Sequence, residues 1–251
     1  MNRWLVFISL VLLCSGKILS QNTDGFLRIN PTISYKFNKN WKTELDYRFT
    51  LDNNMSRFRS THIQLSTAYK IIKPLSIELG YRYTATPQWN PHRIMVSVSY
   101  KHKFEHFSLS ARTRYQFSTV YFDPYFMNQV RAPRQYFRQK IGVDYAIPNT
   151  KVSVFASSEI FFRMRYSTLE WHRMRYQIGV EKELKYGNTI GLRVIYEDRV
   201  NPNSQDRIIV TAKYDLSIDT MIKKINKKKK KKAKKEAKAQ SNPESTAPVI
   251  E

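Results

Sequence analysis

Arginines and carboxylates recur at every second position along several stretches of this sequence, opposite an apolar set. Glu44, Asp46 and Arg48, for example, alternate with Leu45 and Tyr47. Because the side chains of a strand point to opposite faces in turn, such charges share one face. That face could hold Arg–carboxylate pairs that offset each other's desolvation, or a surplus of arginine that attracts anions. The predicted charged set on this face is Glu44, Asp46, Arg48, Arg59, Glu78, Arg82, Arg112, Arg114, Glu159, Arg163, Arg173, Arg175, Arg193 and Glu197.

The charge balance favours anionic partners but does not decide between these alternatives. The 251 residues carry a formal net charge of +23. From Asp219 to Glu251 there are 11 lysines against four carboxylates, or +7, so the rest of the chain carries +16. The charged face therefore supports two hypotheses. One is a network that fills the lumen of a barrel, and the other is an anion-attracting pore or ligand pocket.

Catalytic chemistry has little support in the sequence. It contains five histidines and many serines, but no nucleophile elbow, paired-histidine zinc motif or phosphate-binding Gly loop. His92 and Asp123 fall in separate predicted loops and are the candidates for an acid/base pair in an alternative, enzymatic hypothesis. We predict no catalytic residue, no metal and no cofactor.

The charged face needs a β-architecture to position it, and the alternation indicates one. From Leu75 to Ser118 the pattern runs through three strands of roughly 9–11 residues, the length of a tilted membrane-crossing strand. Similar segments between Phe26 and Ile218 bring the number of predicted strands to eleven. Single-chain bacterial barrels normally have an even number, so we predict ten to twelve antiparallel strands. Pro31 marks the first strand as an edge, an irregular strand or a broken one.

The same pattern indicates a membrane protein. No stretch after the first 20 residues has the roughly 18 consecutive apolar residues of a transmembrane helix. Short connections alternate with longer ones, as in outer-membrane barrels. The short ones lie near Asn38, Lys73, Glu105, Pro148 and Tyr186, and the longer ones near Asn53, Pro87, Pro124, Thr168 and Pro202. Aromatic residues close to the short connections predict an interfacial girdle of Phe37, Trp41, Tyr69, Phe104, Phe107, Tyr145 and Tyr186.

Both ends of the sequence are predicted to lie outside the barrel. Residues 1–20 have the basic start and apolar run of a signal peptide, with cleavage near Gln21, and Cys14 leaves lipidation as an alternative. We predict a barrel over 21–218 and a disordered tail over 219–251. The tail is either solvated without a partner or contacts anionic head groups or envelope polymers. The contacting lysines would be Lys227, Lys228, Lys229, Lys230, Lys231 and Lys232.

Short motifs in several predicted strands resemble a known family. They are Glu44-Leu45-Asp46-Tyr47-Arg48, Arg57-Phe58-Arg59, Tyr81-Arg82-Tyr83 and Arg173-Met174-Arg175-Tyr176. This set, spread over roughly Gly25 to Ile218, is similar to the bacterial family catalogued as domain of unknown function 2490. The resemblance implies an outer-membrane β-barrel of unsettled function and brings no catalytic residues. The Lys-rich tail lies outside it.

These observations predict an all-β, monomeric, antiparallel barrel in the bacterial outer membrane, in contact with its lipid and with the tail in the periplasm. The role is predicted to be structural, or narrow solute transport or binding through the Arg-rich lumen. No nucleic-acid partner is expected behind a signal peptide. Two alternatives stay open: an outer-membrane enzyme that hydrolyses lipid or peptide, and a secreted soluble β-protein that binds polyanions.

Overall fold

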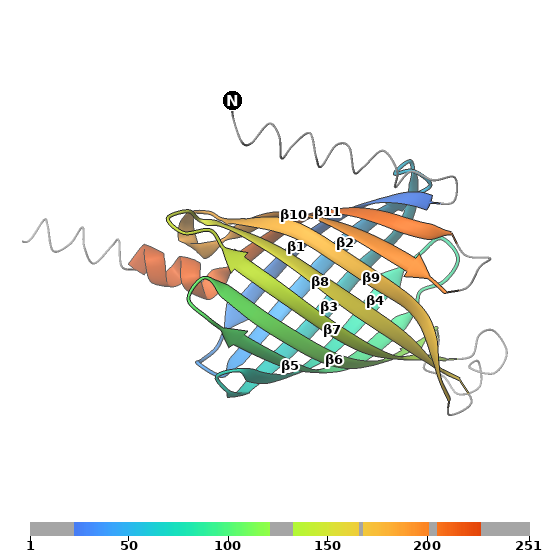
Figure 1. Cartoon of the computed structure of the whole chain (residues 1–251), viewed down its shortest axis with the longest axis horizontal. Coiled ribbons are helices and arrows are strands. Elements are labelled where there is room, and N and C mark those ends of the chain that lie inside the picture. Colours follow the sequence, from blue (N-terminus) through green and yellow to red (C-terminus); the bar gives the residue numbers. More distant parts are fainter. Residues whose placement is uncertain (1–22, 121–132, 166–167, 201–204, 227–251) are drawn as a thin grey trace, which may run out of the picture.

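A computed structural model describes residues 23–120, 133–165, 168–200 and 205–226. In these residues the strands close into one barrel (Figure 1). The first six are β1 Thr23–Lys36, β2 Trp41–Asp52, β3 Arg57–Ile72, β4 Leu75–Ala85, β5 His92–Lys103 and β6 Phe107–Thr119. The other five are β7 Arg134–Ala146, β8 Val152–Arg165, β9 Thr168–Glu183, β10 Thr189–Arg199 and β11 Asp206–Ser217.

The barrel is closed by a parallel pair of strands. β1 and β11 run in the same direction, from Thr23 opposite Asp206 to Ser34 opposite Ser217. Every other pair of neighbours in the described barrel is antiparallel. Strands that alternate in direction around an odd-numbered ring must meet once in parallel. The predicted antiparallel barrel of ten to twelve strands is confirmed, with eleven strands in the described residues. The number is odd, although single-chain barrels normally have an even number, and the β1–β11 seam is the one parallel pair among the described strands.

The connections divide into two groups at opposite mouths of the barrel. We call the end where β2, β4, β6, β8 and β10 finish the long-loop mouth, and the other end the short-turn mouth. Two of the predicted longer connections were wrong. The one near Asn53 spans only residues 53–56, no longer than the β1–β2 turn at 37–40. The one at Thr168 is mostly strand, because β8 continues to Arg165 and β9 begins at Thr168. Since β1 is parallel to β11, the described chain starts at the long-loop mouth and leaves the barrel at the short-turn mouth.

Pro31 lies inside a continuous strand and not at a break. The pairing of β1 with β2 is interrupted between Ile29 and Thr32, because proline has no N–H for the ladder. The register places Tyr47 opposite Pro31, and the Asn30 side chain donates a hydrogen bond to the Tyr47 carbonyl oxygen at 2.9 Å. The Asn30 amide thus supplies the donor that the proline lacks.

Replacing Asn30 with alanine is expected to lower the free energy of unfolding by about 1–3 kcal/mol, because a buried carbonyl loses its donor. Urea unfolding in lipid vesicles, followed by tryptophan fluorescence, measures the change. Asn40→Ala in the exposed β1–β2 turn is the matched control, with an expected cost below about 0.5 kcal/mol. An equal cost at both positions would contradict this role of Asn30.

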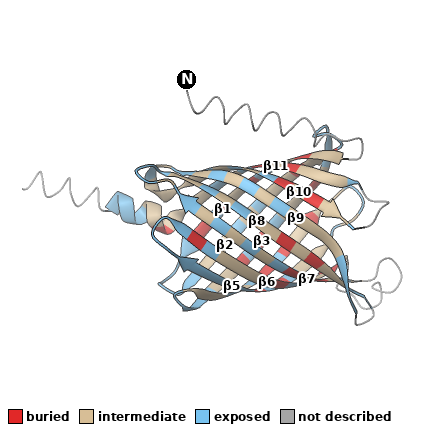
Figure 2. Cartoon of the chain, in the orientation of Figure 1, coloured by how far each residue is buried: buried red, intermediate tan, exposed pale blue. Residues whose placement is uncertain are grey.

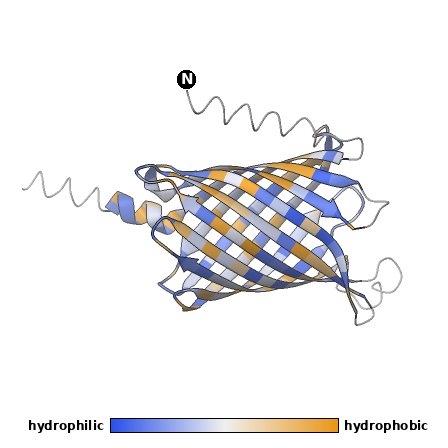
Figure 3. Cartoon of the chain, in the orientation of Figure 1, coloured by the Kyte–Doolittle hydropathy of each residue, from blue (hydrophilic) through white to orange (hydrophobic). Residues whose placement is uncertain are grey.

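Polar side chains face the lumen and apolar side chains face outward, the reverse of a soluble protein. Leu79 and Ile178 are 59% and 63% exposed, whereas Ser97 and Gln116 are each 1% exposed. Figures 2 and 3 show exposed, apolar positions alternating with buried ones along the outer wall. This distribution is that of a transmembrane barrel.

Aromatic residues gather at the short-turn mouth, where the girdle was predicted. Trp41 packs on Tyr69 at 4.8 Å between ring centroids, and Phe104 stacks on Phe107 at 4.2 Å. All four are exposed, as are Phe37 and Tyr145, but Tyr186 is only half-exposed.

Beyond β11, residues 218–226 form a helix where we expected a disordered tail from Asp219. Ser217 Oγ donates to the Asp219 carboxylate at 3.1 Å at the start of this helix. It points away from the short-turn mouth in Figure 1. In the described chain, no helix is long and apolar enough to cross a membrane.

Candidate anion-binding site

The charged residues predicted for one face occupy inward-facing positions of seven strands. They alternate with the exposed apolar residues of β2, β3, β4, β6, β8, β9 and β10 or lie beside them at bulges, and they meet in the lumen. Two glutamates organise most of the contacts. Glu159 on β8 is 5% exposed and Glu197 on β10 is 1% exposed. Each is surrounded by arginines from neighbouring strands.

Glu159 binds three arginines. Arg138 Nη2 donates to both carboxylate oxygens at 2.8 Å, and Arg112 Nη2 donates to one of them at 3.1 Å. Arg175 Nη1 lies 3.7 Å from the other oxygen. Charge-assisted bonds of this kind are about twice as strong as neutral ones. Glu159 therefore joins β6, β7 and β9 through the middle of the lumen.

Glu197 is shared by four arginines near the long-loop mouth. Arg173, Arg199 and Arg207 approach its Oε1 at 3.4, 3.4 and 3.6 Å. Arg175 donates to its Oε2 and so connects Glu197 to Glu159. One carboxylate thus faces four guanidinium groups, which leaves a net positive charge beside it.

Phe161 is an apolar residue among these charges. It is 1% exposed, and the guanidinium groups of Arg138, Arg173 and Arg175 lie 4.3, 4.2 and 4.8 Å from its ring centroid. Cations over a ring face are attracted by its quadrupole, so Phe161 holds the three arginines in place. Sequence analysis missed it, although it alternates with Glu159 and Arg163 on the lumen-facing side of β8.

A bulge brings Arg59 to the lumen. The pairing of β2 with β3 shifts between Thr50 and Leu51, so that Ser60 and Phe58 have partners and Arg59 between them has none. Arg59 Nη1 donates to Asp52 at 2.8 Å, and Arg57 Nε donates to the same carboxylate at 3.1 Å. An extra residue in a strand redirects its side chains in this way.

Other lumen arginines have no carboxylate partner among the described residues. Arg82 Nε donates to the Gln64 amide oxygen at 2.9 Å, and Arg93 Nε donates to Ser118 Oγ at 2.8 Å. Arg28 and Arg163 have neither a hydrogen bond nor an ion pair within the described part of the chain. Guanidinium groups stay protonated in proteins, so these four cations lack a counter-charge.

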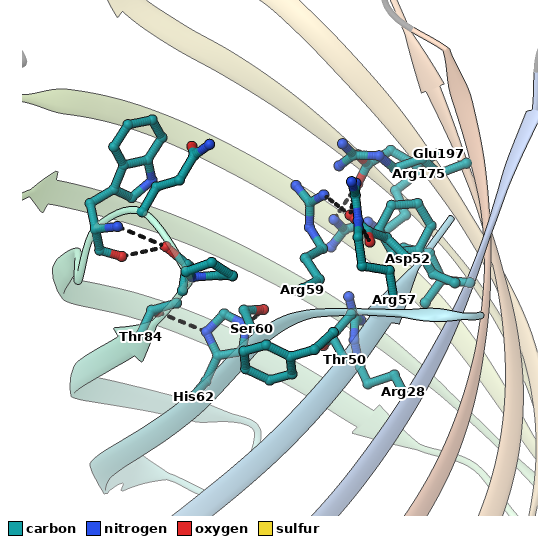
Figure 4. Close-up of a pocket in the computed structure, with 18 of the residues that line it drawn as sticks. Arg28, Thr50, Asp52, Arg57, Arg59, Ser60, His62, Thr84, Arg175 and Glu197 are labelled. Atoms are coloured by element: carbon teal, nitrogen blue, oxygen red, sulfur yellow. Dashed lines mark hydrogen bonds and ion pairs between the residues drawn. The ribbon is translucent and has the colours of Figure 1, made fainter. Parts of the chain in front are cut away.

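Two cavities open at the long-loop mouth, and each is lined by at least six arginines. The first, of about 520 Å³, is shown in Figure 4, where Asp52 lies between Arg57 and Arg59. Its charged residues are Arg28, Arg57, Arg59, Arg173, Arg175 and Arg207, with Asp52 and Glu197. The second cavity, of about 430 Å³, has no carboxylate among its described lining residues. Its arginines are Arg59, Arg93, Arg134, Arg163, Arg173, Arg199 and Arg207. The two cavities share three arginines, and we call them together the mouth site.

One family model matches more than half of this chain. Residues 29–208 match the model of a family described as "Protein of unknown function (DUF2490)". The chain belongs to this family. No match was found among curated proteins.

Solved structures similar to this DUF2490 chain are barrels of low identity. A bacterial polysaccharide outer membrane secretin has 9% identity and a TM-score of 0.45, with 72% of this chain and 63% of that chain covered. A porin has 13% identity and a TM-score of 0.34, with 69% of this chain and 56% of that chain covered. OccAB4 of Acinetobacter baumannii has 10% identity and a TM-score of 0.34, with 68% of this chain and 50% of that chain covered. The chain spans less than two thirds of each of these structures, and such scores transfer no function.

The remaining predicted residues do not join the mouth site. His92 begins β5, and its Nδ1 lies 2.6 Å from the Tyr81 hydroxyl. Asp123 and Lys227 to Lys232 lie outside the described residues. Glu44 pairs with Lys42 at the short-turn mouth, and Arg193 Nη2 donates to Glu181 at 3.0 Å. Within the described ranges, His, Cys, Asp and Glu form no group of three that could hold a metal ion.

The four remaining members of the predicted set form two pairs in the lumen away from the mouth. Arg114 Nη2 donates to Glu78 at 2.9 Å, and Arg48 lies 3.5 Å from Asp46. Most of the predicted set thus divides into paired charges deep in the lumen and an excess of arginine at the mouth, whereas Arg82 lies in the lumen with the Gln64 amide as its partner. The sequence missed Arg28, Arg57, Arg93, Arg134, Arg199 and Arg207 as members of the site.

Proposed function

We propose that this protein is a bacterial outer-membrane barrel that binds anionic solutes at its long-loop mouth. The observation that carries the proposal is the second cavity, where seven arginines meet with no carboxylate among the described lining residues. A site that concentrates positive charge inside low-dielectric walls attracts anions. In bacterial barrels the longer loops face outward, so the mouth site would open to the outside.

The charges deep in the lumen support a structural role there. Glu78, Glu159 and Asp46 each have at least one arginine partner, which offsets the desolvation of both charges. The two sequence hypotheses thus apply to different depths of one barrel. We propose a filled, ion-paired interior with an anion-binding chamber above it.

Equilibrium dialysis with radiolabelled sulfate tests the proposal on the purified full chain in detergent. Arg28→Gln and Arg163→Gln each remove a guanidinium that has no carboxylate partner in the described chain. The double variant is expected to bind sulfate about tenfold more weakly or worse, since charge-assisted bonds contribute about 1.5–3 kcal/mol. Binding should also weaken as the salt concentration rises.

Lys36→Gln is the matched control, because it removes one positive charge from the opposite mouth. Its sulfate affinity is expected to stay within about twofold of the unmodified protein, given screening over this distance. Sulfate binding that is unaffected by the double arginine variant, or equally reduced by Lys36→Gln, would contradict a specific mouth site.

A further inference from the structure

We infer that the mouth site takes an acidic oligosaccharide, a chain of sugar rings that carry carboxylate groups. The inference rests on the proposed anion-binding function and names its ligand class. It is carried by an indole that lines two adjoining arginine-lined cavities, and by unpartnered polar groups in one of them.

Trp89 lines both cavities. It belongs to the β4–β5 connection, whose own hydrogen bonds fix its shape. The Trp89 N–H donates to Thr86 Oγ1 at 3.1 Å, and the Thr84 N–H donates to the Pro91 carbonyl oxygen at 3.0 Å across the base of the connection. The half-buried indole is therefore a preformed wall. Flat apolar surfaces of this kind pack against the C–H faces of sugar rings.

The floor of the first cavity combines an aromatic ring with two cations. Phe26 is 2% exposed, and Arg59 and Arg207 lie 5.2 and 4.8 Å from its ring centroid. These guanidinium groups come from β3 and β11, on either side of β1. Arg59 also lines the second cavity, as does Arg207. A carboxylate placed between them would meet two planar, bidentate donors.

Neutral polar groups in the first cavity match the hydroxyls of a sugar. Thr50 is 2% exposed, and its buried hydroxyl has no hydrogen-bond partner among the described residues. Arg28 Nε, beside it in Figure 4, has none either. Ser60, His62, Thr84, Thr86 and Gln88 complete the polar lining. An inorganic anion would use the arginines and leave the hydroxyl and amide groups without a role.

The volumes favour an extended ligand over a single small ion. At about 520 and 430 Å³, each cavity falls in the range of roughly 300–1,000 Å³ typical of sites for organic molecules. Because the cavities share Trp89 and three arginines, one ligand can run through both. A chain with an acidic group on each ring fits two adjoining cationic cavities.

Isothermal titration of the full chain in detergent with trigalacturonate, its methyl ester and sulfate tests the inference. Trigalacturonate is expected to bind at least about tenfold more tightly than sulfate, because it adds ring contacts to the same charges. The neutral ester should bind about tenfold more weakly than the acid. Trp89→Ala should weaken trigalacturonate binding about tenfold and change sulfate binding less than about twofold.

Two further variants keep the result interpretable if Trp89→Ala does not fold. Trp89→Phe retains an aromatic wall and is expected to bind trigalacturonate within about threefold of the unmodified protein. Trp171→Ala removes an exposed indole near the same mouth and should leave binding unchanged. If sulfate binds but trigalacturonate binds no tighter, or if the ester binds as well as the acid, the sugar inference is overturned and the anion site stands. If neither anion binds, the proposed function fails as well.

Discussion

Glu197→Gln is expected to lower the free energy of unfolding by about 3–5 kcal/mol, because it leaves four arginines without their shared carboxylate. The side chain is 1% exposed, so water cannot replace the lost charge. Removing one partner from a buried ion pair costs far more than the pair itself contributes, since the desolvation of the other partner is no longer offset. Here one substitution affects Arg173, Arg175, Arg199 and Arg207 together.

Urea titration in lipid vesicles measures this effect, with unboiled samples on a denaturing gel reporting the folded fraction. Glu44→Gln is the matched control, because it makes the same chemical change in the exposed Lys42–Glu44 pair. An exposed pair contributes about 0–1 kcal/mol. Equal losses from the two variants would show that Glu197 does not hold the arginine cluster together.

A second change separates charge balance from loss of contacts. Arg175 bridges Glu197 and Glu159, so replacing it with methionine in the Glu197→Gln background removes one uncompensated cation and keeps a side chain of similar length. We expect this double variant to be less destabilised than the sum of the two single variants by about 1–3 kcal/mol.

The strands could be predicted from the sequence because lipid and lumen impose opposite demands on alternate residues. The predicted run of three strands from Leu75 to Ser118 begins where β4 begins and ends one residue before the end of β6. The prediction failed at Thr168, because β8 and β9 are 14 and 16 residues long and both exceed the roughly 9–11 residues expected of a membrane-crossing strand. Alternation identifies a strand but does not show how far it extends beyond the membrane.

Closure could not be predicted, because it depends on contact between the two ends of the barrel sequence. The partner of β1 is β11, nearly 200 residues later, and nothing in the alternation of Phe26 or Ile209 specifies a parallel seam. Pro31 indicated an irregular first strand. The compensation of the missing proline N–H by the Asn30 amide can be seen only from the register, which places Tyr47 opposite Pro31.

The mouth site was only partly predictable. Arg93 alternates with Ile94, so its inward direction followed from the pattern, although it was not singled out. Arg59 reaches the lumen through a bulge, which no local pattern locates. Trp89 lies in a connection, where side-chain direction has no period at all. The sequence thus predicts some of the charges that enter the lumen, but the other members of the site, and the division into paired and unpaired groups, require the register.

Leu79→Arg is expected to destabilise the barrel by about 2–4 kcal/mol in lipid vesicles, because it places a cation near the midplane of the apolar wall. Leu79 lies in the middle of β4, opposite Thr67 and Val96 on the neighbouring strands, and is 59% exposed. In a soluble protein the same substitution at an exposed site would change the free energy of unfolding by about 0.5 kcal/mol or less. The experiment therefore separates a membrane barrel from the secreted, soluble alternative.

Ile71→Arg provides the depth control for this prediction. Ile71 is an outward-facing residue, 47% exposed, near the end of β3 beside the exposed aromatic residues of the short-turn mouth. Near the interface a charge costs about 0–1 kcal/mol, because a long side chain can reach water. Urea unfolding of both variants in vesicles should give a large loss for Leu79→Arg and a small one for Ile71→Arg. Losses that are small and equal would mean that the outer wall does not meet hydrocarbon, and the outer-membrane placement of the mouth site would then be wrong.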